Sequence, residues 1–203
     1  MTQRRISNPL ALAVLGLLFE KPLHPYDMVA TLRDREKHDS INIKYGSLYT
    51  VVRALERDGL IVGAGTVREG RYPERTLYEI TPAGRVEFHD WLAELIGTPQ
   101  QEFPQFLAGL SLLPGLPPAE AANLLEARAE KLAARVAELR TQLAERPADF
   151  WEVFVIEDDY RLTVFTAELD WVRRLAARIR SDDLSGIAEL RELHRHHGSG
   201  PME

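Results

Sequence analysis

The chain has 203 residues, 45% of them hydrophobic and 28% charged, which is the composition of a globular protein with one large domain or two modest ones. It has no cysteine, which excludes disulfide scaffolds, cysteine-ligated zinc, iron–sulfur clusters and thiol nucleophiles. The formal net charge is −6, yet residues 1–95 carry 13 basic and 13 acidic residues, so the acidic excess lies entirely in residues 96–203. Because contact with phosphate is largely electrostatic, only the first half is a candidate for binding nucleic acid.

The N-terminus imitates a secretory signal, because two arginines precede an apolar run over residues 10–19. Asn8 and Pro9 directly before the run are instead typical of a helix start, with Asn as the cap and Pro at the first helical position. The run has no cleavage site of small residues and is too short to cross a bilayer. We therefore expect a buried helix over residues 9–20 of a cytoplasmic protein with no membrane partner.

Two more short helices and a β-hairpin complete the first half. A second helix is expected after Pro25 and a third over residues 45–58, closed by Gly59. The β-type residues 60–67 and 75–80 flank a polar turn, which predicts a hairpin with a charged tip. Thr81 and Pro82 repeat the cap signal and start a fourth helix. Its apolar side is predicted from the i, i+4, i+7 spacing of Phe88, Leu92 and Leu95.

The second half is predicted to be helical throughout. A long helix from Pro118 to about residue 145 carries apolar residues at coiled-coil spacing, namely Leu125, Ala129, Leu132, Val136, Leu139 and Leu143. The next helix, over about residues 148–180, has two apolar stripes and must be covered on two sides. One stripe contains Val153, Ile156, Tyr160, Val164, Ala167, Trp171 and Leu175, and the other Phe154, Phe165, Leu169, Val172, Ala176 and Ile179.

These elements predict a mainly α protein with a small β-hairpin wing. The expected domains are a winged helix-turn-helix domain over residues 1–96 and a C-terminal α-helical dimerisation and effector domain over residues 97–185. Residues 186–203 are expected to be a flexible C-terminal tail, in which three apolar residues keep a helical spacing.

Three helices followed by a hairpin is the element order of a winged helix-turn-helix, whose third helix lies in the major groove of DNA. On a helical wheel of residues 45–58, the apolar side chains share one side. The other side is therefore expected to face solvent. An ordinary charged surface would explain each feature alone, but their order and joint placement favour DNA binding. The predicted DNA-binding residues are Lys44, Tyr45, Gly46, Ser47, Tyr49, Thr50, Arg53 and Arg57 from the helix, with Arg68, Arg71 and Arg75 from the hairpin.

Three motifs stand in order in the first half. They are Pro22-Leu23-His24-Pro25-Tyr26-Asp27, then Tyr45-Gly46-Ser47-Leu48-Tyr49 with the following Leu55-Glu56-Arg57-Asp58-Gly59-Leu60, and then Tyr78-Glu79-Ile80-Thr81-Pro82-Ala83-Gly84. With these motifs the chain resembles the PadR-type transcriptional regulators over roughly residues 8–95. Two departures are that Tyr45 and Thr50 stand where the family often has proline, and that Pro25 replaces a usual glycine.

The resemblance implies a homodimer that binds a palindromic operator in double-stranded DNA, represses transcription and is released by a small effector. The apolar stripes of the second half also call for an outside partner, although they could instead pack only on one another within one chain. The residues predicted to form the dimer are Leu125, Leu132, Val136, Leu139, Leu143, Val164, Trp171 and Leu175.

A small aromatic or amphipathic effector is expected to bind aromatic residues of the second half, with core packing as the alternative for each of them. The effector candidates are Phe106, Trp151, Phe154 and Tyr160. We find no pairing of a nucleophile with a base and no metal-binding spacing, so no enzyme, cofactor or metal is expected. The competing hypothesis is a winged-helix module that binds a protein rather than reading DNA directly.

Overall fold

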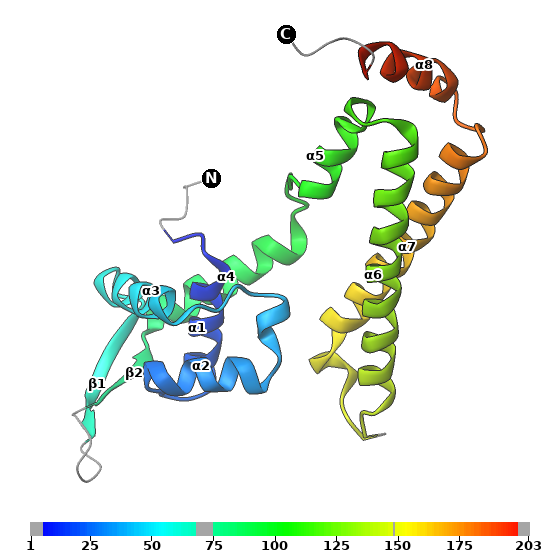
Figure 1. The fold of residues 1–203 in the computed structure, drawn as a ribbon. Coiled ribbons are helices and arrows are strands. Elements are labelled where there is room, and N and C mark those ends of the chain that lie inside the picture. Colours follow the sequence, from blue (N-terminus) through cyan, green and yellow to red (C-terminus); the bar gives the residue numbers. More distant parts are fainter. Residues whose placement is uncertain (1–5, 68–74, 148, 199–203) are drawn as a thin grey trace. The chain divides into compact units, whose positions relative to one another are not determined.

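A computed structural model describes residues 6–67, 75–147 and 149–198 and divides the chain into two compact units, Met1–Gln101 and Glu102–Glu203. The division lies a few residues beyond the expected domain boundary. Both units are helical apart from one antiparallel pair of strands among the described residues (Figure 1). This confirms the predicted mainly α fold with a β-hairpin wing. Among the described residues, no helix is both long and apolar enough to span a membrane.

The first unit is built around its N-terminal helix α1, which is buried on several sides. Asn8 caps this helix by accepting a hydrogen bond from the Leu10 N–H at 3.0 Å, as the sequence predicted. Leu10, Val14 and Leu15 are fully buried and pack with side chains of the other helices and of the hairpin. The elements of this unit are α1 (Pro9–Glu20), α2 (Pro25–Asp34), η1 (Lys37–Asp39), α3 (Tyr45–Arg57), β1 (Ile61–Val67), β2 (Arg75–Ile80) and α4 (Pro82–Gly97).

The hairpin is tied both to α4 and to the segment before α2. The Thr81 hydroxyl donates to the Gly59 carbonyl oxygen at 2.8 Å and accepts from the Gly84 N–H at 3.0 Å, so it also caps α4. Leu23 and Tyr78 exchange two backbone hydrogen bonds of 3.1 and 3.0 Å. The start of α2 is therefore fixed beside strand β2.

The predicted apolar face of α4 is only partly correct. Phe88 packs against the core of the first unit, but Leu92 is 39% exposed and Leu95 is 43% exposed. The buried residues of α4 are Gly84 and Trp91, so the core face follows Gly84, Phe88 and Trp91 at i, i+4 and i+7. Several apolar residues on one helix allow more than one stripe, and packing against α1 selects this one.

The second unit is a pair of long helices with shorter helices before and after it. Its core contains Leu125, Leu132, Leu169, Val172 and Ile179 among other side chains of α6, α7 and α8. The helix predicted from residue 148 begins later, at Ile156, because the preceding residues form a separate short turn. The elements are α5 (Gln105–Ser111), η2 (Leu113–Gly115), α6 (Pro118–Ala144), η3 (Glu152–Phe154), α7 (Ile156–Arg180) and α8 (Ile187–Gly198).

Helix α8 lies where the sequence suggested a flexible tail. Ile187 is only 6% exposed and belongs to the core of the second unit, and Leu190 packs against that core. The Nε2 of His194 is 2.9 Å from the Pro114 carbonyl oxygen. Burial of the apolar side of α8 stabilises a helix that its short polar sequence alone would not hold.

Candidate nucleic-acid interface

Helix α3 presents one buried face and one solvent face. Leu48, Val52 and Leu55 are at most 2% exposed, because they pack in the core of the first unit. The opposite face is exposed and carries Gly46, Tyr49, Thr50, Arg53 and Arg57, while Ser47 is half-buried at its edge. A Cβ on Gly46 would meet no atom within 4 Å, so the glycine leaves open space rather than solving a packing problem. Another surface can therefore approach the first turn of α3 closely.

The cations near this face differ in their pairing. Lys44 is exposed immediately before α3, and Arg53 forms no hydrogen bond or ion pair with another described residue. Arg57, by contrast, has its Nε 3.1 Å from Oδ1 of Asp58. The Thr50 hydroxyl donates to the Gly46 carbonyl oxygen at 3.1 Å, so its proton already forms a hydrogen bond within the helix. Among the described cations near this face, Lys44 and Arg53 are therefore the ones whose charge is not neutralised by another described side chain.

A hollow of about 320 Å³ lies beside Arg53, where the start of α2, the middle of α3 and strand β2 meet. The Nδ1–H of His24 donates to the Thr76 carbonyl oxygen at 2.8 Å and holds the α2 start against β2. Tyr26 is 56% exposed and Tyr49 is 45% exposed. The lining residues are His24, Pro25, Tyr26, Tyr49, Val52, Arg53, Thr76 and Tyr78.

Tyr78 and Glu56 join the wing to α3 at the side of this hollow. The Tyr78 hydroxyl donates to Oε2 of Glu56 at 3.4 Å. Burial and the nearby Glu56 carboxylate raise the pKa of Tyr78, so the hydroxyl stays protonated and remains a donor. This contact orients β2 against α3 and also places one negative charge among the basic groups.

The sequence did not identify His24, Tyr26, Thr76 or Tyr78 as parts of this surface. Two signals were available. Pro25 marks the start of α2, and a helix start offers free backbone N–H groups. Thr76 and Tyr78 alternate along β2, so they share one face of the strand.

The predicted wing residues cannot all be placed. Arg68 and Arg71 lie outside the described residues. The backbones of Tyr45 and Arg75 begin α3 and β2, but the side chains of both also lie outside the described part of the chain.

The predicted dimerisation residues of α6 are largely covered within the chain, which corrects the interpretation that this seam needs an outside partner. Leu125, Leu132 and Val136 pack against α7 residues in the core, Leu139 is 2% exposed and Leu143 is half-buried. These apolar side chains of α6 are already covered, because α7 supplies a matching apolar stripe that includes Leu169, Val172 and Ile179.

The other stripe of α7 is exposed over most of its length, and Leu175 at its end is half-buried against the core. Among the predicted dimerisation residues, Val164 is 38% exposed and Trp171 is 42% exposed. Ile156 and Tyr160 extend this exposed stripe with 60% and 68% exposure. The doubly apolar helix thus has one stripe in the core and one at the surface.

The structure does not gather the four effector candidates into one site. The Phe106 ring contacts Trp171 at 6.2 Å between centroids, and the Arg128 guanidinium lies 3.7 Å above it. Trp151 and Phe154 stack at 5.9 Å just before α7, roughly 20 Å along the helix from Trp171. Tyr160 is exposed on the surface stripe.

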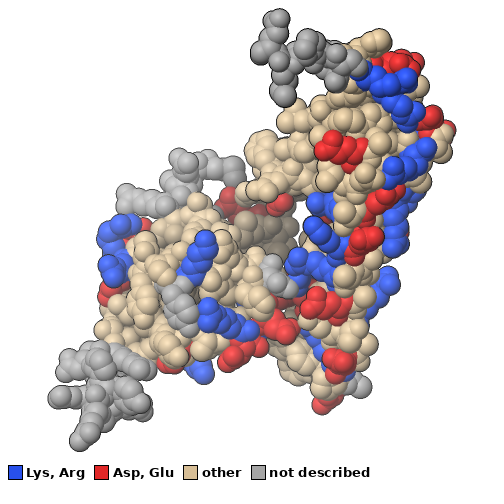
Figure 2. Space-filling view, in the orientation of Figure 1, with Lys and Arg blue, Asp and Glu red and all other residues tan. Residues whose placement is uncertain are grey.

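Charges in the second unit are largely paired with one another. Basic and acidic side chains alternate along the visible faces of α6 and α7 (Figure 2). Arg180 donates to both carboxylate oxygens of Glu126 at 2.9 and 2.7 Å, and Arg128 pairs with Glu168. A surface of mixed, paired charges offers little net attraction for a phosphate backbone.

Comparisons with known proteins find a family model and a relative that match this chain in sequence. The model of the transcriptional regulator PadR-like family matches residues 14–90. The negative transcriptional regulator PadR of Bacillus subtilis strain 168 is 27% identical over 128 residues, which is 63% of this chain and 69% of the relative.

Solved structures share the fold over both units. Bacillus subtilis PadR has a TM-score of 0.64 both with operator DNA and with p-coumaric acid, at 22% and 20% identity. These comparisons cover 86% and 84% of this chain and 99% and 98% of the solved chains. The Vibrio cholerae virulence activator AphA has a TM-score of 0.63 at 19% identity, with 85% and 98% covered. The matched residues 14–90 contain α3 and both strands of the wing, so this part of the chain matches the transcriptional regulator PadR-like family.

Proposed function

We propose that the chain is a dimeric, sequence-specific DNA-binding regulator that represses transcription and is released by a small molecule. The observation that carries the proposal is the solvent face of α3. There Arg53, which pairs with no other described residue, and the nearby Lys44 lie beside open space at Gly46. A regulator of this kind acts on chromosomal DNA, and we place it in the cytoplasm.

DNA contact is divided between α3 and its neighbours. Gly46 and the short side chains near it allow the start of α3 to sink into the major groove, with Arg53 one to two turns further along. Lys44 and the first backbone N–H groups of α3 meet a phosphate. Tyr26 and Tyr49 at the rim of the hollow supply hydroxyl donors for the sugar–phosphate backbone.

The dimer forms through the exposed stripe of α7. Ile156, Tyr160, Val164 and Trp171 lie on one side of this helix, and burial in a second copy would remove their apolar surface from water. The two copies would place two α3 helices on half-sites roughly one helical turn, about 10 base pairs, apart or at a multiple of that spacing. This symmetry explains why a palindromic operator is expected.

Repression and release are proposed from the relatives. The 27% identical relative is a negative regulator, whereas the fold alone also serves a virulence activator. Bacillus subtilis PadR has been solved with p-coumaric acid, so a small-molecule effector is proposed here as well. The family assignment disfavours the alternative of a protein-binding module, and a transcriptional regulator is not an enzyme.

The test is binding of the full chain to the DNA upstream of its own gene, measured by fluorescence anisotropy at two salt concentrations. The double variant Lys44→Ala, Arg53→Ala should bind at least about tenfold more weakly and lower the log–log salt slope by about 2. The control Lys131→Ala, Arg173→Ala removes the same charges from exposed positions of α6 and α7 and should bind like the wild type. Equal binding by both double variants would overturn the proposal.

A further inference from the structure

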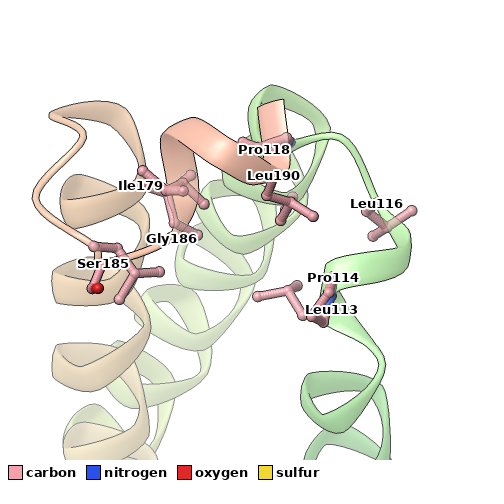
Figure 3. Close-up of a pocket in the computed structure, with 11 residues that line it drawn as sticks. Leu113, Pro114, Leu116, Pro118, Ile179, Ser185, Gly186 and Leu190 are labelled. Carbon is pink, nitrogen blue, oxygen red and sulfur yellow. The ribbon is translucent and has the colours of Figure 1, made fainter. Parts of the chain in front are cut away.

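The second unit contains an apolar pocket of about 250 Å³ between η2, the start of α6, the end of α7 and α8. Ala121, Ile179 and Ile187 form a buried floor, since they are 2%, 2% and 6% exposed. The mouth is marked by the exposed residues Pro114, Ser185 and Gly186. Figure 3 shows side chains entering the pocket from η2 and from α8, among them Leu113 and Leu190.

Local chain geometry keeps this space open. Pro118 is the first residue of α6 and follows η2 closely, and residues of η2 and of the end of α7 line opposite parts of the same pocket. Gly186 has φ +82°, which lets the chain reverse between α7 and α8. The α8 side chains then line one side of the pocket instead of filling it.

Polar contacts of α8 side chains that do not line the pocket hold this helix in place. His194 bonds to the Pro114 carbonyl oxygen at 2.9 Å and thereby joins α8 to η2. Arg191 donates to both carboxylate oxygens of Asp182 at 2.9 and 2.6 Å. Because Arg191 is neutralised by this pair, it offers no spare charge to an ionised ligand.

The chemistry of the lining selects the ligand class. Among the described lining residues no side chain is ionisable, and the Ser185 hydroxyl is the one polar side-chain group. Apolar cavities of roughly 150 Å³ stay dry and bind benzene, so a larger apolar pocket is suited to a larger apolar molecule. A charged ligand would lose its hydration without gaining a partner.

We propose that this pocket binds a small, uncharged molecule with an apolar body and at most a hydroxyl-type head near Ser185. The site is distinct from the aromatic effector candidates, because Phe106, Trp151, Phe154 and Tyr160 do not line it. The ligand would bind to the chain in the absence of DNA, so this proposal does not depend on the proposed function.

The experiment uses 1-octanol and octanoate as probes with the full chain and no DNA. Titration calorimetry and saturation-transfer NMR should show one 1-octanol per chain and binding of octanoate that is at least about tenfold weaker. Leu116→Trp should fill the pocket and weaken 1-octanol binding about tenfold or more. Leu112→Trp adds the same ring at a neighbouring 75% exposed position outside the lining and should leave binding unchanged.

Circular dichroism establishes that each variant is folded, and Leu190→Trp fills the pocket from α8 if Leu116→Trp does not fold. Failure of the folded wild type to bind 1-octanol would overturn the proposal. Equal binding of the two probes, or equal binding by the pocket-filling and control variants, would also overturn it. None of these outcomes bears on DNA binding, which is measured separately.

Discussion

Gly84 lies directly against the backbone carbonyl of Leu60. A Cβ at Gly84 would stand 2.0 Å from that oxygen and 2.8 Å from Cγ1 of Ile80, so only glycine fits. The same carbonyl accepts a hydrogen bond from the Thr81 N–H at 3.0 Å. This close approach places the first turn of α4 on the base of the wing and fixes the hairpin that carries part of the proposed DNA surface.

Gly84→Ala should destabilise the first unit by about 3 kcal/mol or more, because backbone cannot move aside as a flexible side chain can. Urea unfolding followed by the fluorescence of Trp91, with Trp151 and Trp171 replaced by Phe, measures the change. Gly97→Ala on the same helix meets no atom within 4 Å and should be neutral or stabilise slightly. Equal stability of the two variants would contradict the packing argument.

Arg53 and Arg57 should contribute unequally to DNA binding, although both lie on the exposed face of α3. Arg57 is already paired with Asp58, and DNA would have to compete with that carboxylate. Arg53→Ala should therefore weaken operator binding by about 1–3 kcal/mol, and Arg57→Ala by clearly less. Anisotropy titrations at a single salt concentration make the comparison, and a larger loss for Arg57→Ala would show that the assignment is reversed.

Tyr160→Glu should shift the protein from dimer to monomer without unfolding it, because this side chain is 68% exposed in the single chain. A buried carboxylate in the interface should raise the dimer dissociation constant at least about tenfold, or 1.4 kcal/mol. Ala177→Glu, at an exposed position of α7 away from the stripe, is the control. Analytical ultracentrifugation over a concentration series measures the dimer dissociation constant of each variant. A wild-type monomer at micromolar concentration would refute the dimer.

Asp158 should make the stability of the second unit depend on pH. Burial alone would raise the pKa of this carboxyl, but hydrogen bonds from Arg146 at 2.6 Å and Arg161 at 2.9 Å outweigh it and lower the pKa. A carboxyl with a lowered folded pKa stabilises the fold above its unfolded pKa of about 3.9, and that contribution is lost as pH falls through the folded value.

Asp158→Asn should therefore cost about 2 kcal/mol near pH 7, and the difference from wild type should shrink as pH falls below about 4. Urea unfolding followed by circular dichroism at several pH values tests this. Asp159→Asn removes the same charge from the same turn of α7 at an exposed position and serves as the control. A difference between Asp158→Asn and wild type that is constant with pH would exclude the titration of Asp158 as its cause.

The local elements of the first unit could be predicted because their signals lie within a few residues of one another. Asn8 and Thr81 accept the capping hydrogen bonds predicted for them. The solvent face of α3 follows from its period, since Leu48 and Leu55 must point inward. The match of residues 14–90 to the PadR-like family could likewise be predicted from motifs in order and spacing.

The contacts between distant segments could not be predicted in this way. Heptad spacing on α6 shows that the helix must be covered, but not whether α7 or a second chain covers it. Likewise, nothing local places His24 beside Thr76, or α8 across from Pro114 to enclose a pocket. The sequence by itself determined the helices, the wing and the exposed face of α3, because periodicity and capping are local. Only the tertiary structure decided which apolar stripe of α7 is buried and which stays exposed, because burial depends on the partner that packing brings.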